Sequence, residues 1–170
     1  MMREQDVLDV LNLLADAGLT AWVDGGWGVD ALLAVTTREH EDLDLVVRLD
    51  EIDMVRTALA RAGFTTVLRD WLPTALAVAD HTGRSVDLHP ITRSPDGGGH
   101  QALLDGDSFH YPPPVRGLIG GQVVACVDPA TQMLCHVGYE LTEKDRADMA
   151  NLRAIYGPVV SHPSGHDRAP

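Results

Sequence analysis

The sequence predicts an α+β domain, and three observations support this prediction. The chain has 170 residues, 45% of them hydrophobic, which is enough to bury one sizeable core. Apolar residues recur with helical spacing in residues 5–17. Branched apolar residues fill residues 43–49 and recur at 84–91, which is typical of strands. Helices and strands therefore alternate within one unit.

The first three elements surround a glycine pair. A helix is expected over residues 5–17, because a glycine directly follows its last apolar positions. Residues 20–24 are predicted as a short strand. The Gly25-Gly26 pair permits a tight turn from this strand into a helix at 27–34.

The next elements are a strand at 43–49 and a helix at 50–62, which a glycine ends. Three further strands are expected, the last two joined as a hairpin by a His-Thr-Gly turn. Their predicted ranges are 64–68, 74–80 and 84–91.

The texture of the sequence changes after Pro90. Residues 93–121 mix glycine, proline and turn residues, and we expect loops with one or two short strands there. A strand at 122–127 then leads into a helix at 129–137, and a last helix begins after Thr142.

Composition argues against several kinds of partner. Thirteen Lys and Arg against 25 Asp and Glu give a net charge of −12, which opposes binding to a nucleic-acid backbone. No run reaches the roughly 18 apolar residues of a membrane span, and acidic residues stand where a secretory signal has its apolar core. We expect no nucleic-acid partner, no membrane partner and a cytoplasmic location. Cys126 and Cys135 match no zinc spacing and are predicted as buried thiols.

Two aspartates lie at the start of the predicted strand at 43–49 and share one of its faces. Asp42 and Asp44 point the same way because side chains alternate along a strand. Two carboxylates this close repel, unless they are well solvated or a cation neutralises them. Hard oxygen ligands suit Mg²⁺, which commonly shares its shell with substrate phosphates. The alternative is a solvated strand end with two surface aspartates.

A third aspartate and the glycine pair favour the metal interpretation. Asp87 lies between apolar neighbours in a later strand, where a lone carboxylate is unfavourable. Gly25 and Gly26 offer backbone N–H groups at a helix start, where phosphate oxygens bind readily. A metal site and a phosphate site are therefore expected on adjacent elements.

These residues together resemble a known family. The glycine pair, Asp-x-Asp on the next strand and a later third Asp are similar to the signature of the polymerase-β-type nucleotidyltransferase superfamily. The runs GGWGVDALL, TREHEDLDL and HVGYELTEKDRADMANL more closely resemble small antibiotic nucleotidyltransferases of the lincosamide type, which are related to aminoglycoside 2''-adenylyltransferases. The resemblance covers residues 18–157. It implies a polymerase-β-like fold: a mixed twisted sheet with helices on one face and a small C-terminal part of helix and loop.

The resemblance also implies a reaction. A nucleoside monophosphate, AMP from ATP, would be transferred with Mg²⁺ to a hydroxyl of a small-molecule antibiotic, most simply a lincosamide. Asp42 and Asp44 would be catalytic metal ligands, and Asp87 would complete the metal shell or act as the base. The nucleotidyltransferase core would span 1–95, with an acceptor-binding part of the same unit at 96–160 and a disordered tail at 161–170.

Two cations are candidates for nucleotide binding, beside Gly25 and Gly26. Arg38 could reach phosphate oxygens as a planar fork, or form a surface ion pair with Glu39 or Glu41. Lys144 opens the last helix, where the helix dipole disfavours positive charge. It could contact phosphate or simply lie on a solvated helix face.

Four side chains are candidates for substrate binding. Trp27 could wall a pocket or be a buried aromatic anchor. His89 lies on the face of Asp87 and could contact metal or substrate, or pack structurally. Tyr111 could line the acceptor pocket or pack within a proline-rich loop. Tyr139 is implied by the resemblance of the C-terminal run.

Two other functions are weighed against a lincosamide transferase. An aminoglycoside, a hydroxyl-rich cation, could be the acceptor, because the chain is acidic. A nucleotidyltransferase-fold antitoxin or regulator could instead act on a protein partner, but an intact set of three aspartates favours catalysis. A homodimer is a further expectation, because a small acceptor lobe can need a neighbour's surface.

Overall fold

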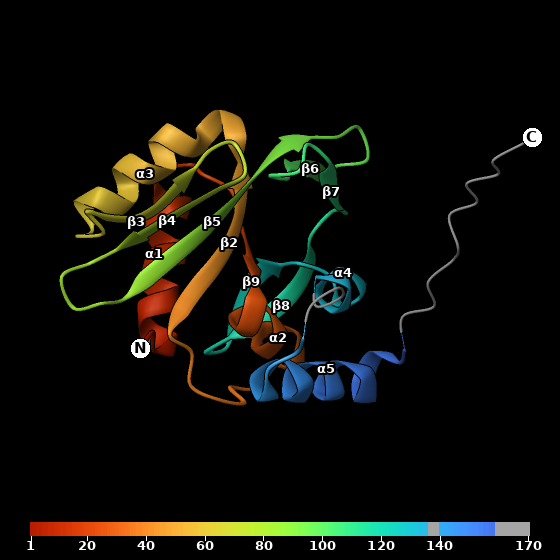
Figure 1. The fold of residues 1–170 in the computed structure, drawn as a ribbon. Helices are drawn as coiled ribbons and strands as arrows, with labels where there is room; N and C mark the ends of the chain where they lie inside the picture. The colour runs from red at the N-terminus through yellow and green to blue at the C-terminus, as the bar shows by residue number, and fades with distance from the viewer. Residues whose placement is uncertain (136–139, 159–170) are drawn as a thin grey trace, which may run out of the picture.

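A twisted, nine-stranded mixed sheet is the centre of the structure, a computed structural model that describes residues 1–135 and 140–158 (Figure 1). The helices are α1 Glu4–Asp16, α2 Gly25–Leu33, α3 Ile52–Arg61, α4 Pro129–Leu134 and α5 Glu143–Tyr156. A 3₁₀ turn at Leu49–Glu51 precedes α3. The strands are β1 Ala21–Asp24, β2 Asp42–Arg48, β3 Thr66–Trp71, β4 Ala75–Ala79, β5 Ser85–Arg93, β6 Gly99–Ala102, β7 Ser108–Tyr111, β8 Val115–Ile119 and β9 Gln122–Cys126.

The sheet joins both halves of the chain. Its strand order is β3-β4-β5-β2-β1-β9-β8, and the β6–β7 hairpin continues from the end of β5. Strand β2 is antiparallel to β1 and parallel to β5, while β1 is parallel to β9. The predicted mixed sheet is therefore confirmed, with β1, β2 and β5 adjacent near its middle.

One face of the sheet is covered by helices α1, α2 and α3. Leu43, Leu45 and Val47 of β2 are buried in the core on this face. The alternate side chains of β2, Asp44 and Val46 among them, point to the opposite face. A separate small apolar cluster lies on that second face, next to the β6–β7 hairpin. The alternation thus divides the sheet into a core face and a face available to ligands.

The C-terminal helices pack against α2 rather than on the sheet. Their apolar contact with α2 is formed by four buried residues, Val29, Met133, Met149 and Leu152. Asp128 caps α4, and Thr142 with Asp145 forms a capping box on α5. Within residues 1–135 and 140–158, no helix has the length and apolar character needed to cross a membrane.

The prediction for residues 93–121 was wrong in its strand content. Three strands, β6, β7 and β8, form there instead of one or two. Two tight turns connect β5 to β6 and β6 to β7, with Gly97 and Gly106 at φ of 91° and 93°. These strands are only four or five residues long, so their pairing depends on the turns. The predicted tail at 161–170 lies outside the described residues.

Candidate active site

Three aspartates lie side by side on the helix-free face of the sheet. In the strand register, Asp44 of β2 is opposite Asp24 of β1 on one side and Asp87 of β5 on the other. Asp42 lies two residues before Asp44 on the same strand and therefore shares this face. The structure thus brings the three predicted aspartates together and adds a fourth, Asp24.

Sequence reasoning missed Asp24. It is the last residue of β1, directly before the glycine pair, and its side chain accepts the N–H of Gly25 at 2.9 Å. Asp24 could have been found from the pairing of β1 with β2, because the register places it directly opposite Asp44. That pairing joins strands separated by a helix and a loop, so no local pattern reveals it.

The aspartates differ in their environments. Asp24 is 4% exposed, and burial raises the pKa of its carboxyl. Burial and then the negative charge of Asp44 raise the pKa of both Asp42 and Asp87. Arg69 partly offsets this at Asp87, where its guanidinium donates to the carboxylate at 3.2 Å. The group is therefore an electrostatically unfavourable set of carboxylates that a bound cation would relieve.

Gly25 is required by the geometry of this site. Its φ is 57°, in the left-handed region, and a Cβ there would lie 2.2 Å from Oδ2 of Asp44. The backbone at Gly25 consequently passes closer to Asp44 than a residue with a Cβ could. Gly26 has other neighbours, because a Cβ at that position would meet the ring of His40 at 2.4 Å and Arg38 at 2.6 Å. Its predicted phosphate contact remains a prediction.

A cavity of about 550 Å³ opens beside Asp24 and Asp44. It is lined by residues of both halves of the chain, which are Asp24, Gly25, Asp44, His89, Gln101, Leu103, Phe109, Tyr111, Gln132, Leu134 and Cys135. This volume lies within the roughly 300–1,000 Å³ of typical small-molecule pockets. Both His89 and Tyr111, predicted as substrate-binding residues, line it.

A hydrogen-bond network fixes the floor of this cavity. His89 Nε2 lies 3.3 Å from Asp44 Oδ1, and Gln101 Nε2 lies 3.3 Å from His89 Nδ1. The hydroxyl of Tyr111 donates to both Asp24 and Gln101 at 3.3 Å. Burial and then the negative charge of Asp24 raise the pKa of Tyr111 far above its usual value, so it remains a donor.

His89 itself is poised to carry a positive charge. Burial lowers its pKa, but the hydrogen bond to Asp44 and the charges of Asp24, Asp44 and Asp87 outweigh burial and raise it overall. A protonated His89 would partly neutralise the carboxylates beside it. Its same-face position, predicted from the strand period, places it beside Asp44 on the wall of the cavity.

Other predicted site residues have different surroundings. Trp27 is 3% exposed within the main core, against His40 at 4.6 Å between ring centroids, so the buried-anchor alternative describes its position. Arg38 donates to the carboxylate of Asp148 on α5, at 2.7 Å from Nη2, and not to Glu39 or Glu41 carboxylates.

The remaining two candidates lie at the C-terminal part of the chain. Lys144 is exposed and pairs with Glu41 at 3.0 Å. Its nucleotide contact remains a prediction. Tyr139 lies outside the described residues.

The donor set fits Mg²⁺ only if substrate completes the shell. In the part of the chain that the structure describes, no three His, Cys, Asp or Glu side chains are gathered closely enough to hold a metal ion. Asp42 and Asp44 provide two carboxylates on one face, which is the usual protein contribution to a Mg²⁺ site shared with phosphates. A third ligand from Asp87 remains a prediction.

Comparison with known proteins agrees with this geometry. A family model described as aminoglycoside-2''-adenylyltransferase matches residues 6–152. A lincosamide resistance protein of Staphylococcus haemolyticus is 30% identical over 156 residues, covering 91% of this chain and 96% of that protein.

Two solved structures share the fold. The lincosamide antibiotic adenylyltransferase LnuA, crystallised with lincomycin bound, is 29% identical with a TM-score of 0.81, covering 91% of this chain and 98% of that chain. ANT(2")-Ia in complex with adenylyl-2"-tobramycin has a TM-score of 0.72 at 16% identity, with 91% and 89% coverage, which shows a shared fold. The chain therefore belongs to the aminoglycoside-2''-adenylyltransferase family and is a nucleotidyltransferase.

Proposed function

We propose that this enzyme transfers AMP from ATP to a hydroxyl group of a lincosamide, with Mg²⁺ bound at Asp42 and Asp44. The observation that carries the proposal is the cavity of about 550 Å³ directly beside Asp24 and Asp44. The similarity to LnuA, whose structure contains lincomycin, supports this choice of acceptor. The acceptor-binding role proposed for residues 96–160 is supported by Gln101, Tyr111 and Leu134, which line the cavity.

The residues divide the reaction between them. When bound, Mg²⁺ would neutralise triphosphate charge and stabilise the in-line displacement at the α-phosphorus. Asp42 and Asp44 would hold the metal ion in place. Because Gly25 has no Cβ, it leaves room for the carboxylate of Asp44. The acceptor oxygen forms the new bond to phosphorus while pyrophosphate leaves.

Asp87 takes the proton of the acceptor hydroxyl in this proposal. Its raised pKa makes it a better base than an ordinary surface aspartate, and it lies directly beside Asp44 in the register. Arg69 keeps the carboxylate in one orientation through its 3.2 Å contact. Asp24, buried at the cavity wall, would attract the protonated amine of an acceptor.

Roles for Arg38 and Lys144 at the nucleotide require a change of partner. Each now faces a carboxylate, that of Asp148 or of Glu41, and a triphosphate would have to compete for it. A substrate contact by Trp27 would likewise require a change in its surroundings, because it is buried in the core against His40.

Mass spectrometry of reaction products tests the proposal. Purified protein, Mg²⁺ and each nucleoside triphosphate would be incubated with lincomycin, clindamycin and several aminoglycosides. We expect an AMP adduct on a lincosamide, formed from ATP, and none with Asp44→Asn. An adduct on an aminoglycoside alone, or none on any small molecule, would overturn the choice of acceptor.

We also propose that the protein forms a homodimer. Light scattering of the purified protein would measure its mass in solution and test this proposal.

A further inference from the structure

A second cavity, of about 440 Å³, lies on the same face of the sheet as the aspartates but further along the strands. Its floor is formed by Trp22, Val46 and Ile91, which are at most 7% exposed. Trp22 and Val46 are opposite each other in the register and lie two residues from Asp24 and Asp44. The three floor residues belong to the same small apolar cluster as Tyr111, which lines the first cavity.

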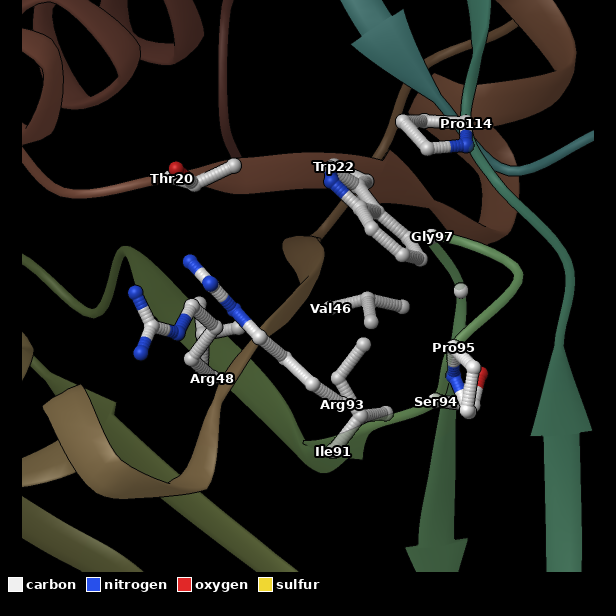
Figure 2. A pocket seen from close by; sticks show the side chains of 12 residues that line it. Thr20, Trp22, Val46, Arg48, Ile91, Arg93, Ser94, Pro95, Gly97 and Pro114 are labelled. Carbon is white, nitrogen blue, oxygen red and sulfur yellow. The ribbon is translucent and has the colours of Figure 1, made fainter.

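The lining combines a flat apolar surface with positive charge on one side. Figure 2 shows Trp22, Val46 and Ile91 facing the cavity, with Pro95 and Pro114 at its rim. In the same view, the guanidinium groups of two arginines reach toward the side of Thr20 (Figure 2). These are Arg48 of β2 and Arg93 at the end of β5.

The two arginines are not equivalent. Arg48 is neutralised by Asp50 and by Glu51, the latter at 2.6 Å. Arg93 makes no side-chain hydrogen bond or ion pair with any residue in the described ranges 1–135 and 140–158. In a chain of net charge −12, one guanidinium is thus available at the mouth of an apolar cavity.

The rim beside Arg93 is already ordered. The turn from Ser94 to Gly98 is closed by backbone bonds of 3.1 Å, and Asp96 accepts the N–H of Gly98 at 2.9 Å. The carboxylate of Asp96 also contacts His110 at 2.9 Å. Within the described residues Asp96 makes no hydrogen bond or ion pair with Arg93, and because the turn is already ordered, little ordering would be needed on binding.

We propose that this cavity binds a small molecule that joins a flat apolar body to a single carboxylate. The flat body would lie against Trp22 and the aliphatic floor, and the carboxylate would accept hydrogen bonds from the guanidinium of Arg93. One available guanidinium matches one carboxylate in charge and in planar geometry. This inference is independent of the proposed function, since it involves none of the aspartates.

Nuclear magnetic resonance can test the site with a matched pair of compounds. The compounds are 2-naphthoate and 2-naphthamide, which have nearly the same shape and differ in charge. The indole N–H signal of Trp22, identified by its loss in Trp22→Phe, reports binding. We expect 2-naphthoate to move this signal with a Kd below about 1 mM, and to leave the indoles of Trp27 and Trp71 unmoved.

Three variants separate charge from shape. Arg93→Gln should weaken 2-naphthoate binding about tenfold and leave 2-naphthamide binding unchanged, because it removes a charge-assisted hydrogen bond. Arg116→Gln removes an equal charge from an exposed position on β8 and should change neither. Thr20→Trp adds bulk at the exposed rim and should block both compounds.

Two results would overturn the proposal. One is the absence of any shift of the Trp22 signal at about 5 mM 2-naphthoate, which is several times the highest expected Kd. The other is equal binding of 2-naphthoate to the native protein and to Arg93→Gln, which would remove the carboxylate from the assignment.

Discussion

At the scale of single residues, Gly25 shows how one missing side chain shapes the site. Gly25→Ala should abolish most transferase activity, because the Cβ would displace the carboxylate of Asp44. Gly18→Ala is the matched control, since Gly18 also has positive φ, 72°, but nothing within 4 Å of its Cβ position. Both variants should lose about 1–2 kcal/mol of unfolding free energy, measured by denaturation. Full activity in Gly25→Ala would show that Asp44 tolerates displacement.

Asp24 should matter for the acceptor and not for folding. Asp24→Asn removes a buried negative charge beside Asp44. Its amide oxygen can accept the N–H of Gly25 and its NH2 can donate to the Tyr111 oxygen, while the Tyr111 hydroxyl donates to Gln101, so stability should be unchanged or higher. The KM for a cationic acceptor should rise about tenfold or more, while that for ATP should stay constant. Steady-state kinetics and thermal unfolding measure both effects.

A second substitution at the same position separates charge from hydrogen bonding. Asp24→Ala leaves the Gly25 N–H without its side-chain acceptor and the Tyr111 hydroxyl with Gln101 alone, and should lower stability by about 1–3 kcal/mol. If Asp24→Asn raised the KM for ATP instead, Asp24 would belong to the nucleotide site.

At the scale of elements, Arg84 joins α1 to the turn between β4 and β5. Its guanidinium contacts Asp6 at 2.7 Å and Asp80 at 2.6 Å, and both carboxylates are almost fully buried. Arg84→Gln should lower the free energy of unfolding by about 1.5–3 kcal/mol at pH 7. Arg56→Gln, which breaks an exposed 3.6 Å pair with Asp70, should change it by less than about 1 kcal/mol.

The effect of Arg84 should depend on pH in a defined direction. Hydrogen bonding to Arg3 holds the pKa of Asp6 well below its usual range, and bonds from Thr82 and Arg84 outweigh burial and do the same for Asp80. The stabilisation of the fold by these two carboxylates is complete above their unfolded-state pKa of about 4 and is lost as pH falls below it. The difference between native protein and Arg84→Gln should therefore shrink in denaturation experiments at pH 3. A constant difference would contradict this linkage.

Some elements and site residues were predictable from local patterns in the sequence. Asp42 and Asp44 were visible because a strand has a period of two, and Asp87 because a carboxylate stood between Val86 and Leu88. Helix α1 followed from apolar periodicity, α2 from the glycine pair before it, and α3 from the glycine that ends it. Local patterns are sufficient for features such as these.

Features that depend on distant pairing were not predictable in this way. Arg38 meets Asp148, which is 110 residues away, and no spacing rule connects them. The hairpin strand β6, with sequence GHQA, has no apolar alternation and exists because β5 and β7 offer hydrogen bonds. For Trp27 the sequence left a pocket wall and a buried anchor open, because the direction of its side chain depends on how α2 packs on the core.

At the scale of the whole molecule, cation binding should offset the repulsion of the aspartates. A complex of Mg²⁺ with a non-hydrolysable ATP analogue, at about 100 times its Kd, should stabilise the native protein by about 2.7 kcal/mol, or ~5–10 °C in Tm. Asp44→Asn should abolish this gain and yet melt no lower than the native protein without Mg²⁺, because repulsion with Asp42 and Asp87 is relieved.

Two controls distinguish specific binding from general screening in a chain of net charge −12. NaCl at the same ionic strength should reproduce little of the gain, and Asp105→Asn, at an exposed position in the turn before β7, should retain all of it. Equal stabilisation by NaCl would mean that Mg²⁺ acts by screening alone. Equal stabilisation of Asp44→Asn would move the metal site away from β2, and with it the chemistry proposed for the cavity beside Asp24.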